Sequence, residues 1–205
     1  MPGSPCVPGG ADLMGAFDAL DAIRERREPK PWVRPEFDPS FIGPVLAFDQ
    51  SLSRTGWALM DCLHPYVHDR GLLTTSPGDE TSIEGSLVRA TALEEEIDHL
   101  VWRLDAPGLM IAHEAPAVAG WRTDSSLLVA LAIRIIARRR KLPLHMVYAQ
   151  HAKRRMTGNA NADKPEVKVA LEEMWPHLKG TRPWNNDIRD AVLIGILALE
   201  EGAAP

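Results

Sequence analysis

The chain has 205 residues, of which 45% are apolar and 25% are charged. This length predicts one domain with a core large enough to fold without disulfides or structural metals, and the composition excludes a disordered, collagen-like or fibrous protein. No apolar run approaches the roughly 18 residues of a membrane span, and no signal peptide is visible. Two cysteines, Cys6 and Cys62, exclude a disulfide framework. We therefore expect a reducing, cytoplasmic setting without a membrane partner.

The net charge of −5 is distributed unevenly along the chain. The segment 115–168 holds eleven basic and three acidic residues, a net +8, which leaves −13 on the rest of the chain. This asymmetry favours one basic face that binds a polyanion, and a solvated basic helix face is the ordinary alternative.

In chain order, residues 1–43 are predicted to form a Pro-rich N-terminal extension and residues 44–205 a folded domain. Within the extension, the abundance of Pro and Gly predicts disorder over residues 1–10. Helical spacing of apolar residues predicts a helix over 11–28, and several prolines interrupt regular structure after it.

The folded domain alternates between short apolar strands and amphipathic helices. Strands are predicted over 45–48, 55–60, 67–74, 109–112 and 144–148, and helices over 80–104, 124–140, 165–174 and 186–201. Residues 50–54 are too few for a crossover helix, so the first two strands are predicted to form a hairpin. The order predicts an α/β fold with a mixed five-stranded sheet, a three-stranded antiparallel part plus parallel strands, flanked by helices.

Four carboxylates lie where these elements begin or end. Asp49 ends the first strand and Glu114 the fourth, so both can project from one edge of the sheet. Asp187 and Asp190 are three residues apart and share one face of the last helix. Converging carboxylates repel one another unless a cation lies among them, and oxygen ligands favour Mg²⁺ or Mn²⁺ over zinc. Two such ions are the usual apparatus for hydrolysis of a phosphodiester.

Taken singly, each acid has an ordinary structural interpretation. Asp49 could begin a turn, Glu114 could pair with an arginine, and Asp187 could interact favourably with the helix dipole. Their joint placement on two strand ends and one helix start favours the metal site. Zinc-ligand spacing, phosphate-binding glycine motifs and a G-x-S-x-G motif do not occur in the sequence.

Four motifs contain or accompany these acids: VLAFDQSLSRTGWA over 45–58, LMIAHE over 109–114, TGNANADK over 157–164 followed by Val167, and DIRDA over 187–191. In content and order they resemble the RuvC-type Holliday junction resolvases of the RNase H-like nuclease superfamily. The first motif resembles that family's opening hairpin and the second its second acid. The third resembles its Gly-Asn-rich loop and the fourth its last pair of acids, so the resemblance covers residues 44–200.

The resemblance implies an RNase H-like fold, a homodimer, Mg²⁺ or Mn²⁺ as cofactor, and paired nicks across a four-way DNA junction. By position in the motifs, Asp49, Glu114, Asp187 and Asp190 are the implied catalytic metal ligands of two ions. Lys164 is implied to approach the scissile phosphate or a neighbouring one, which suits a lysine at a helix N-terminus. Gln50-Ser51 and the missing phenylalanine after the second acid depart from the bacterial pattern and resemble divergent phage members.

The basic segment supplies the remaining candidates for DNA binding. Trp121 is predicted to be a wedge that stacks on an unpaired base, with a core tryptophan as the alternative. One side of helix 124–140 is unusually apolar and is predicted to join the two copies of a homodimer. Its apolar residues are Leu127, Leu128, Leu131 and Ile135. The candidate DNA-binding residues are Trp121, Arg122, Lys153, Arg154, Arg155, Asn159, Asn161, Lys164 and Lys168.

The leading interpretation is therefore a metal-dependent endonuclease that resolves branched DNA. One alternative is a less selective nuclease for flaps or forks, and another is a branched-DNA-binding protein without activity. The four acids argue against a pure binder, because negative charge near phosphates would only weaken binding. A sugar-kinase-like ATP-binding domain is disfavoured by the basic segment 115–168 and by the absence of a second domain.

Overall fold

The computed structural model describes residues 43–61, 66–76, 82–104, 106–115 and 124–201. The predicted helix over 11–28, most of the predicted extension, and the side chains of Trp121 and Arg122 lie outside these ranges, as do both cysteines. The described elements are β1 (Val45–Asp49), β2 (Arg54–Met60), β3 (Val67–Thr74), α2 (Ile83–Arg103), β4 (Met110–Glu114), α3 (Asp124–Arg140), β5 (Leu144–Val147), α4 (Ala149–Thr157), α5 (Lys164–Met174), the short 3₁₀ helix η1 (Pro176–Leu178) and α6 (Asn186–Glu201).

The strands form one five-stranded sheet in the order β3-β2-β1-β4-β5. β1 pairs antiparallel with β2, and β2 pairs antiparallel with β3. On the other side, β1 pairs parallel with β4, and β4 pairs parallel with β5. The predicted mixed sheet, its three-stranded antiparallel part and the opening hairpin are therefore confirmed.

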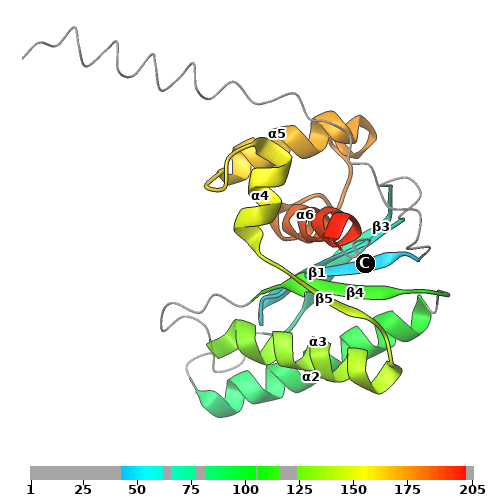
Figure 1. Ribbon diagram of the computed structural model, residues 1–205. Helices are drawn as coiled ribbons and strands as arrows, with labels where there is room; N and C mark the ends of the chain where they lie inside the picture. The colour runs from blue at the N-terminus through cyan, green and yellow to red at the C-terminus, as the bar shows by residue number, and fades with distance from the viewer. Residues whose placement is uncertain (1–42, 62–65, 77–81, 105, 116–123, 202–205) are drawn as a thin grey trace, which may run out of the picture. The chain divides into compact units, whose positions relative to one another are not determined.

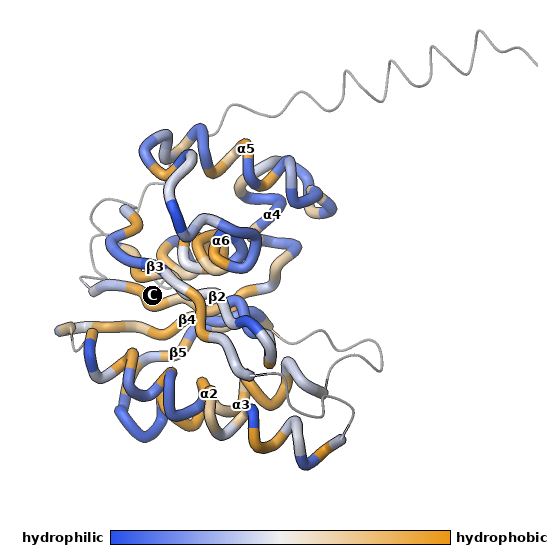
Figure 2. Tube along the Cα trace, turned by 180° about the vertical axis from the view of Figure 1, so that it is seen from behind, coloured by the Kyte–Doolittle hydropathy of each residue, from blue (hydrophilic) through white to orange (hydrophobic). Residues whose placement is uncertain are grey.

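Helices cover both faces of this sheet (Figure 1). α2 and α3 lie against one face, and α6 lies against the other with α4 and α5 outside it. Alternation along β1 explains the two layers, because Val45 and Ala47 pack in the cluster that contains α6 whereas Leu46 and Phe48 pack against α2 and α3. β4 is largely hydrophobic, whereas β3 and the helices combine hydrophobic and hydrophilic residues (Figure 2).

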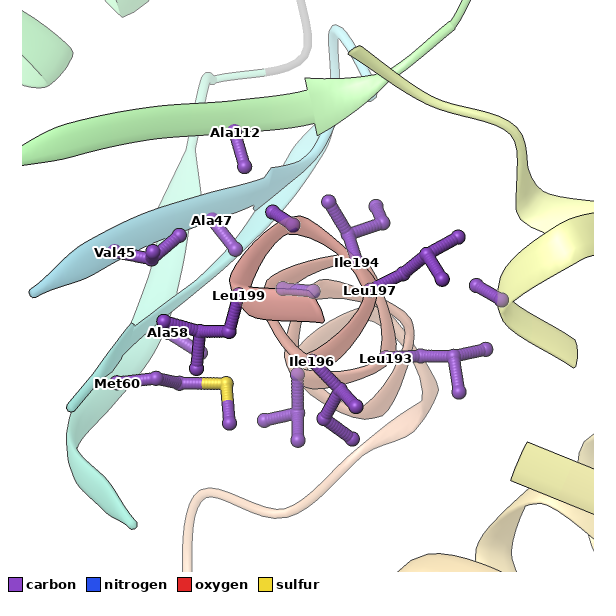
Figure 3. Packing of buried hydrophobic residues seen from close by; sticks show 14 of the residues in the cluster. Val45, Ala47, Ala58, Met60, Ala112, Leu193, Ile194, Ile196, Leu197 and Leu199 are labelled. Atoms are coloured by element: carbon purple, nitrogen blue, oxygen red, sulfur yellow. The ribbon is translucent and has the colours of Figure 1, made fainter. Parts of the chain in front are cut away.

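α6 is the most deeply buried helix of the described fold, and its residues 191–199 are buried on every side. Its side chains Ile196 and Leu199 lie close to Ala58 and Met60 of β2, while Leu193 and Leu197 point toward the neighbouring helices (Figure 3). A helix that is apolar all round must be covered all round. This burial fixes the N-terminal turn of α6 against the sheet.

The sequence analysis predicted no helix or strand for residues 149–164, whereas the structure places α4 at Ala149–Thr157. The signal was weak because α4 has only nine residues and buries only Ala152 and Met156. The predicted elements of the folded domain are otherwise present, with boundaries that differ by at most three residues. In the described part of the chain, no helix combines the length and the apolar character that a membrane crossing requires.

Candidate active site

Asp49 and Glu114 stand side by side at the carboxyl ends of two neighbouring parallel strands. The last paired residues of β1 and β4 are Phe48 and His113, and each acid is the next residue of its strand. Alternation places both acids on the face that α6 covers. The predicted convergence of these two carboxylates at one sheet edge is thus present in the fold.

Gly56 explains how α6 brings its own acids to this edge. Gly56 pairs with Asp49 across the hairpin, and a Cβ atom built on it would lie 2.2 Å from the main-chain oxygen of Asp187. Only a residue without a side chain permits this approach of helix to strand. The Asn185 side chain accepts a hydrogen bond from the Ile188 amide at 3.0 Å and caps the helix, and Arg54 pairs with Asp187 at 3.1 Å.

The four predicted acids interact electrostatically. The pKa of Asp49 is raised to about 8. Burial is the largest cause, and the charges of Asp190, Glu114 and Asp187 add to it in that order of importance. Burial also raises the pKa of Glu114 and of Asp190, and the Asp190 charge adds to the effect on Glu114. These acids therefore share one poorly solvated region in which their negative charges oppose one another.

Two lysines face the acids from α4 and α5. The charge of Lys164 lowers the pKa of Asp49 and of Asp190, and the charge of Lys153 lowers the pKa of Glu114 and of Asp190. The sequence analysis placed Lys164 at the site, but it assigned Lys153 only to DNA binding. The role of Lys153 was missed because α4, the helix from which Lys153 faces the acids, was not predicted.

The start of α5 is fixed by a capping box. Asp163 accepts a hydrogen bond from the Glu166 amide at 2.8 Å, and the Glu166 carboxylate accepts one from the Asp163 amide at 2.9 Å. Pro165 follows in the first turn and has no amide hydrogen. The box holds Lys164 at the first position of the helix, but its carboxylates offset the attraction of the helix end for phosphate. The positive charge near the site therefore belongs to the lysine itself.

The other predicted DNA-binding residues are spread more widely. Arg155 forms an ion pair with Glu200 at 2.8 Å, and Glu200 lies about 15 Å along α6 from Asp190. The charge of Arg155 is therefore neutralised within the fold, away from the acids. The Asn159 side chain accepts a hydrogen bond from the Asn161 amide at 3.0 Å and shapes the loop before α5. Arg154, Asn161 and Lys168 are exposed.

Two buried polar residues at the site were not among the predicted residues. Gln50 follows Asp49 and is 7% exposed, and His113 precedes Glu114 and is fully buried. His113 alternates with the core residue Ile111 along β4, so the signal was a polar residue at a core-facing position of a strand.

The chemistry of the acids suits a hard divalent cation. All four predicted ligands offer carboxylate oxygens. Burial and, after it, repulsion from the other acids raise the pKa of Asp49, and a cation among the acids would offset both effects. Within the described ranges, no three or more His, Cys, Asp or Glu side chains are arranged to hold a metal ion as they stand. The carboxylate chemistry of the donors fits a hard divalent cation, whereas their arrangement does not by itself form a metal site, so the metal site is a proposal.

Comparisons with known proteins bear on the fold. No protein-family model and no curated protein matches the sequence. Among solved structures, Thermus thermophilus RuvC is similar with a TM-score of 0.58 at 16% identity, over 78% of this chain and 93% of that one. T. thermophilus RuvC in complex with a Holliday junction substrate is similar with a TM-score of 0.60 at 14% sequence identity, over 78% of this chain and 97% of that one.

The yeast mitochondrial Holliday junction resolvase Ydc2 gives a TM-score of 0.51 at 11% identity, over 78% of this chain and 79% of that one. At such low identity these matches establish the architecture of the chain. The chain has the RNase H-like fold of RuvC, and the structural likeness that the four sequence motifs predicted is confirmed.

Proposed function

We propose that the protein is a divalent-metal-dependent endonuclease that resolves four-way DNA junctions by paired nicks. The observation that carries the proposal is the convergence of Asp49 with Glu114, Asp187 and Asp190. Burial and, after it, the charges of these three acids raise the pKa of Asp49 to about 8. Bringing four partly buried acids together is unfavourable for stability, and a binding protein has no use for them beside phosphates. The similar RuvC that was solved with a Holliday junction supports branched DNA as the substrate.

The proposed ligands of the ions are Asp49, Glu114, Asp187 and Asp190. Bound Mg²⁺ or Mn²⁺ would supply a more acidic water and charge stabilisation for the leaving oxygen. Lys153 of α4 and Lys164 of α5 both lower the pKa of Asp190, which supports a role for them in binding a phosphodiester at these acids. Their role is to attract the phosphate and to offset the negative charge that develops on it.

A second copy of the chain is the proposed partner, because paired nicks need two active sites. Along α3 the side chains of Leu127, Leu131 and Ile135 are 44%, 54% and 40% exposed, whereas Leu128 is half-buried. These three residues are spaced four apart and form one apolar stripe on the outer side of the helix. Such a stripe suits a C₂ interface, in which each copy covers the other.

Cleavage of a substrate panel tests the proposal. A synthetic four-way junction, a flap, a fork and a linear duplex are each incubated with the protein in Mg²⁺, Mn²⁺ or EDTA. We expect symmetric nicks in the junction with either metal and none with EDTA. Equal cleavage of flaps and forks would favour the less selective nuclease. Binding of the junction without cleavage in either metal would favour a non-catalytic binding protein and contradict the proposal.

A further inference from the structure

Gln50 and His113 form a buried polar pair directly beside the two strand-end acids. The Gln50 side-chain amide donates to the main-chain oxygen of Glu114 at 2.7 Å. Its oxygen lies 3.0 Å from Nδ1 of His113, and the same Nδ1 lies 2.7 Å from the Glu114 oxygen. Three contacts therefore converge on the two residues that flank the acids and on the backbone of one acid.

The contacts define the state of the imidazole. Both neighbours of Nδ1 are oxygens that accept, so Nδ1 carries the proton and donates it. Burial lowers the pKa of His113, which agrees with a neutral ring. Within the described residues Nε2 is buried without a hydrogen-bond partner. An unpaired buried nitrogen is unfavourable for stability, so its presence indicates that a polar side chain is needed at this position for another reason.

Gln50 and His113 lie where the backbone pairing between β1 and β4 ends. The backbone pairing of β1 with β4 ends at Phe48 and His113, one residue before Asp49 and Glu114. The Gln50 side chain crosses from β1 to β4 beyond this last pair and bonds to the backbone of Glu114. It therefore extends the connection between the strands to the two residues that bear the carboxylates.

We propose that Gln50 and His113 are positioning residues that set the separation of the Asp49 and Glu114 carboxylates. This inference rests on the proposed function, because it assigns the pair to the same metal site. The pair lies on the opposite face of the sheet from the carboxylates, so it acts through the backbone and does not touch the ion or the DNA. Loss of the pair lets the ends of β1 and β4 move independently, which weakens metal binding without removing a ligand.

Metal binding to the DNA-free protein is the readout that a merely structural role would not change. Mn²⁺ binding is followed by electron paramagnetic resonance of the free ion, alongside the metal dependence of junction cleavage. We expect Gln50→Met, which keeps the size but loses both polar groups, to raise the half-saturating Mn²⁺ concentration about tenfold or more. His113→Leu should give the same shift. His113→Asn, which can place an amide donor near the position of Nδ1, should restore most of the affinity.

A double-mutant cycle and a control separate positioning from loss of stability. If Gln50 and His113 act as one unit, the double variant should bind Mn²⁺ no more weakly than either single variant. Ile97→Val shortens a buried side chain of α2 and should lower the melting temperature without changing the Mn²⁺ midpoint. If Gln50→Met does not fold, Gln50→Asn keeps a buried amide that is one methylene too short and carries the same expectation.

The outcomes distinguish this inference from the proposed function. A wild-type protein that neither binds Mn²⁺ nor cleaves a junction overturns the proposed function. A wild-type protein that does both, with variants whose Mn²⁺ midpoints are unchanged once the folded fraction is accounted for, overturns the positioning role alone. Additive losses in the double variant would also overturn it, because they would show two independent effects.

Discussion

Replacing Gly56 by alanine tests whether the approach of α6 to β2 builds the site. The added Cβ would lie 2.2 Å from the oxygen and 2.4 Å from the carbon of the Asp187 carbonyl, and 2.9 Å from the Ile188 nitrogen. Non-bonded carbon and oxygen atoms need roughly 3.4 Å, so the first turn of α6 must withdraw by about 1 Å. These atoms belong to the backbone, so no side-chain rotation can relieve the clash.

This displacement should affect cleavage more than folding. Overpacking of this kind costs about 1–3 kcal/mol of stability, whereas a misplacement of about 1 Å in an active site can cost on the order of 10²-fold in rate. Junction cleavage under single-turnover conditions, with thermal unfolding in parallel, measures both effects. Gly195→Ala, on the same helix as Asp187, is the control. Its added Cβ would meet side chains and no backbone, namely the flexible Met60 side chain of β2 at 2.6 Å and the Ala47 Cβ at 3.2 Å. A folded Gly56→Ala protein that cleaves at the wild-type rate would refute the reasoning.

Three further predictions address the charges and the apolar stripe. In metal-free protein the pKa of Asp49 is raised from 3.8 to about 8. Between these pH values the folded state keeps a proton that the unfolded chain releases. The free energy of unfolding therefore falls by up to several kcal/mol as the pH rises through this range. Asp49→Asn should flatten this dependence in melts from pH 5 to 8 in EDTA, and an unchanged slope would contradict the site's electrostatics. Lys164→Ala should slow cleavage about 10²-fold while weakening junction binding much less. Arg155→Ala is the control and should change the rate little, because Arg155 is already paired with Glu200. Equal losses of rate and of binding in Lys164→Ala would show that Lys164 is an ordinary phosphate contact. Leu131→Glu should convert a dimer into a monomer by light scattering and abolish paired nicks, whereas a wild-type mass of one chain would contradict the dimer.

Most of the fold could be predicted from hydrophobic periodicity. The five strands are short apolar runs and the longer helices have clear helical spacing, so their existence and order follow from the sequence. The few residues between the first two strands are too short for a crossover helix and so predicted a hairpin, and the structure has one with four residues between β1 and β2. α4 was not predicted, because a helix of nine residues with only two buried side chains has almost no hydrophobic periodicity in its sequence. Its absence from the prediction hid the route by which Lys153 reaches the acids.

The acids could be predicted because strand ends and helix starts are visible in the sequence. What holds the site together could not be predicted, because it depends on contacts between distant segments. Gly56 is one of fifteen glycines, and only the fold shows Asp187 above it. Gln50 and His113 are 63 residues apart and become partners only when β1 and β4 pair.

Cleavage of a synthetic four-way junction by wild type and Asp49→Asn, side by side in Mg²⁺ or Mn²⁺, tests the central claim most directly. Asp69→Asn removes an exposed carboxylate of β3 outside the candidate site and serves as the matched control. We predict paired nicks from wild type and Asp69→Asn, and no cleavage from Asp49→Asn although it still binds the junction. Cleavage by Asp49→Asn at close to the wild-type rate would contradict the assignment of these acids as the catalytic centre.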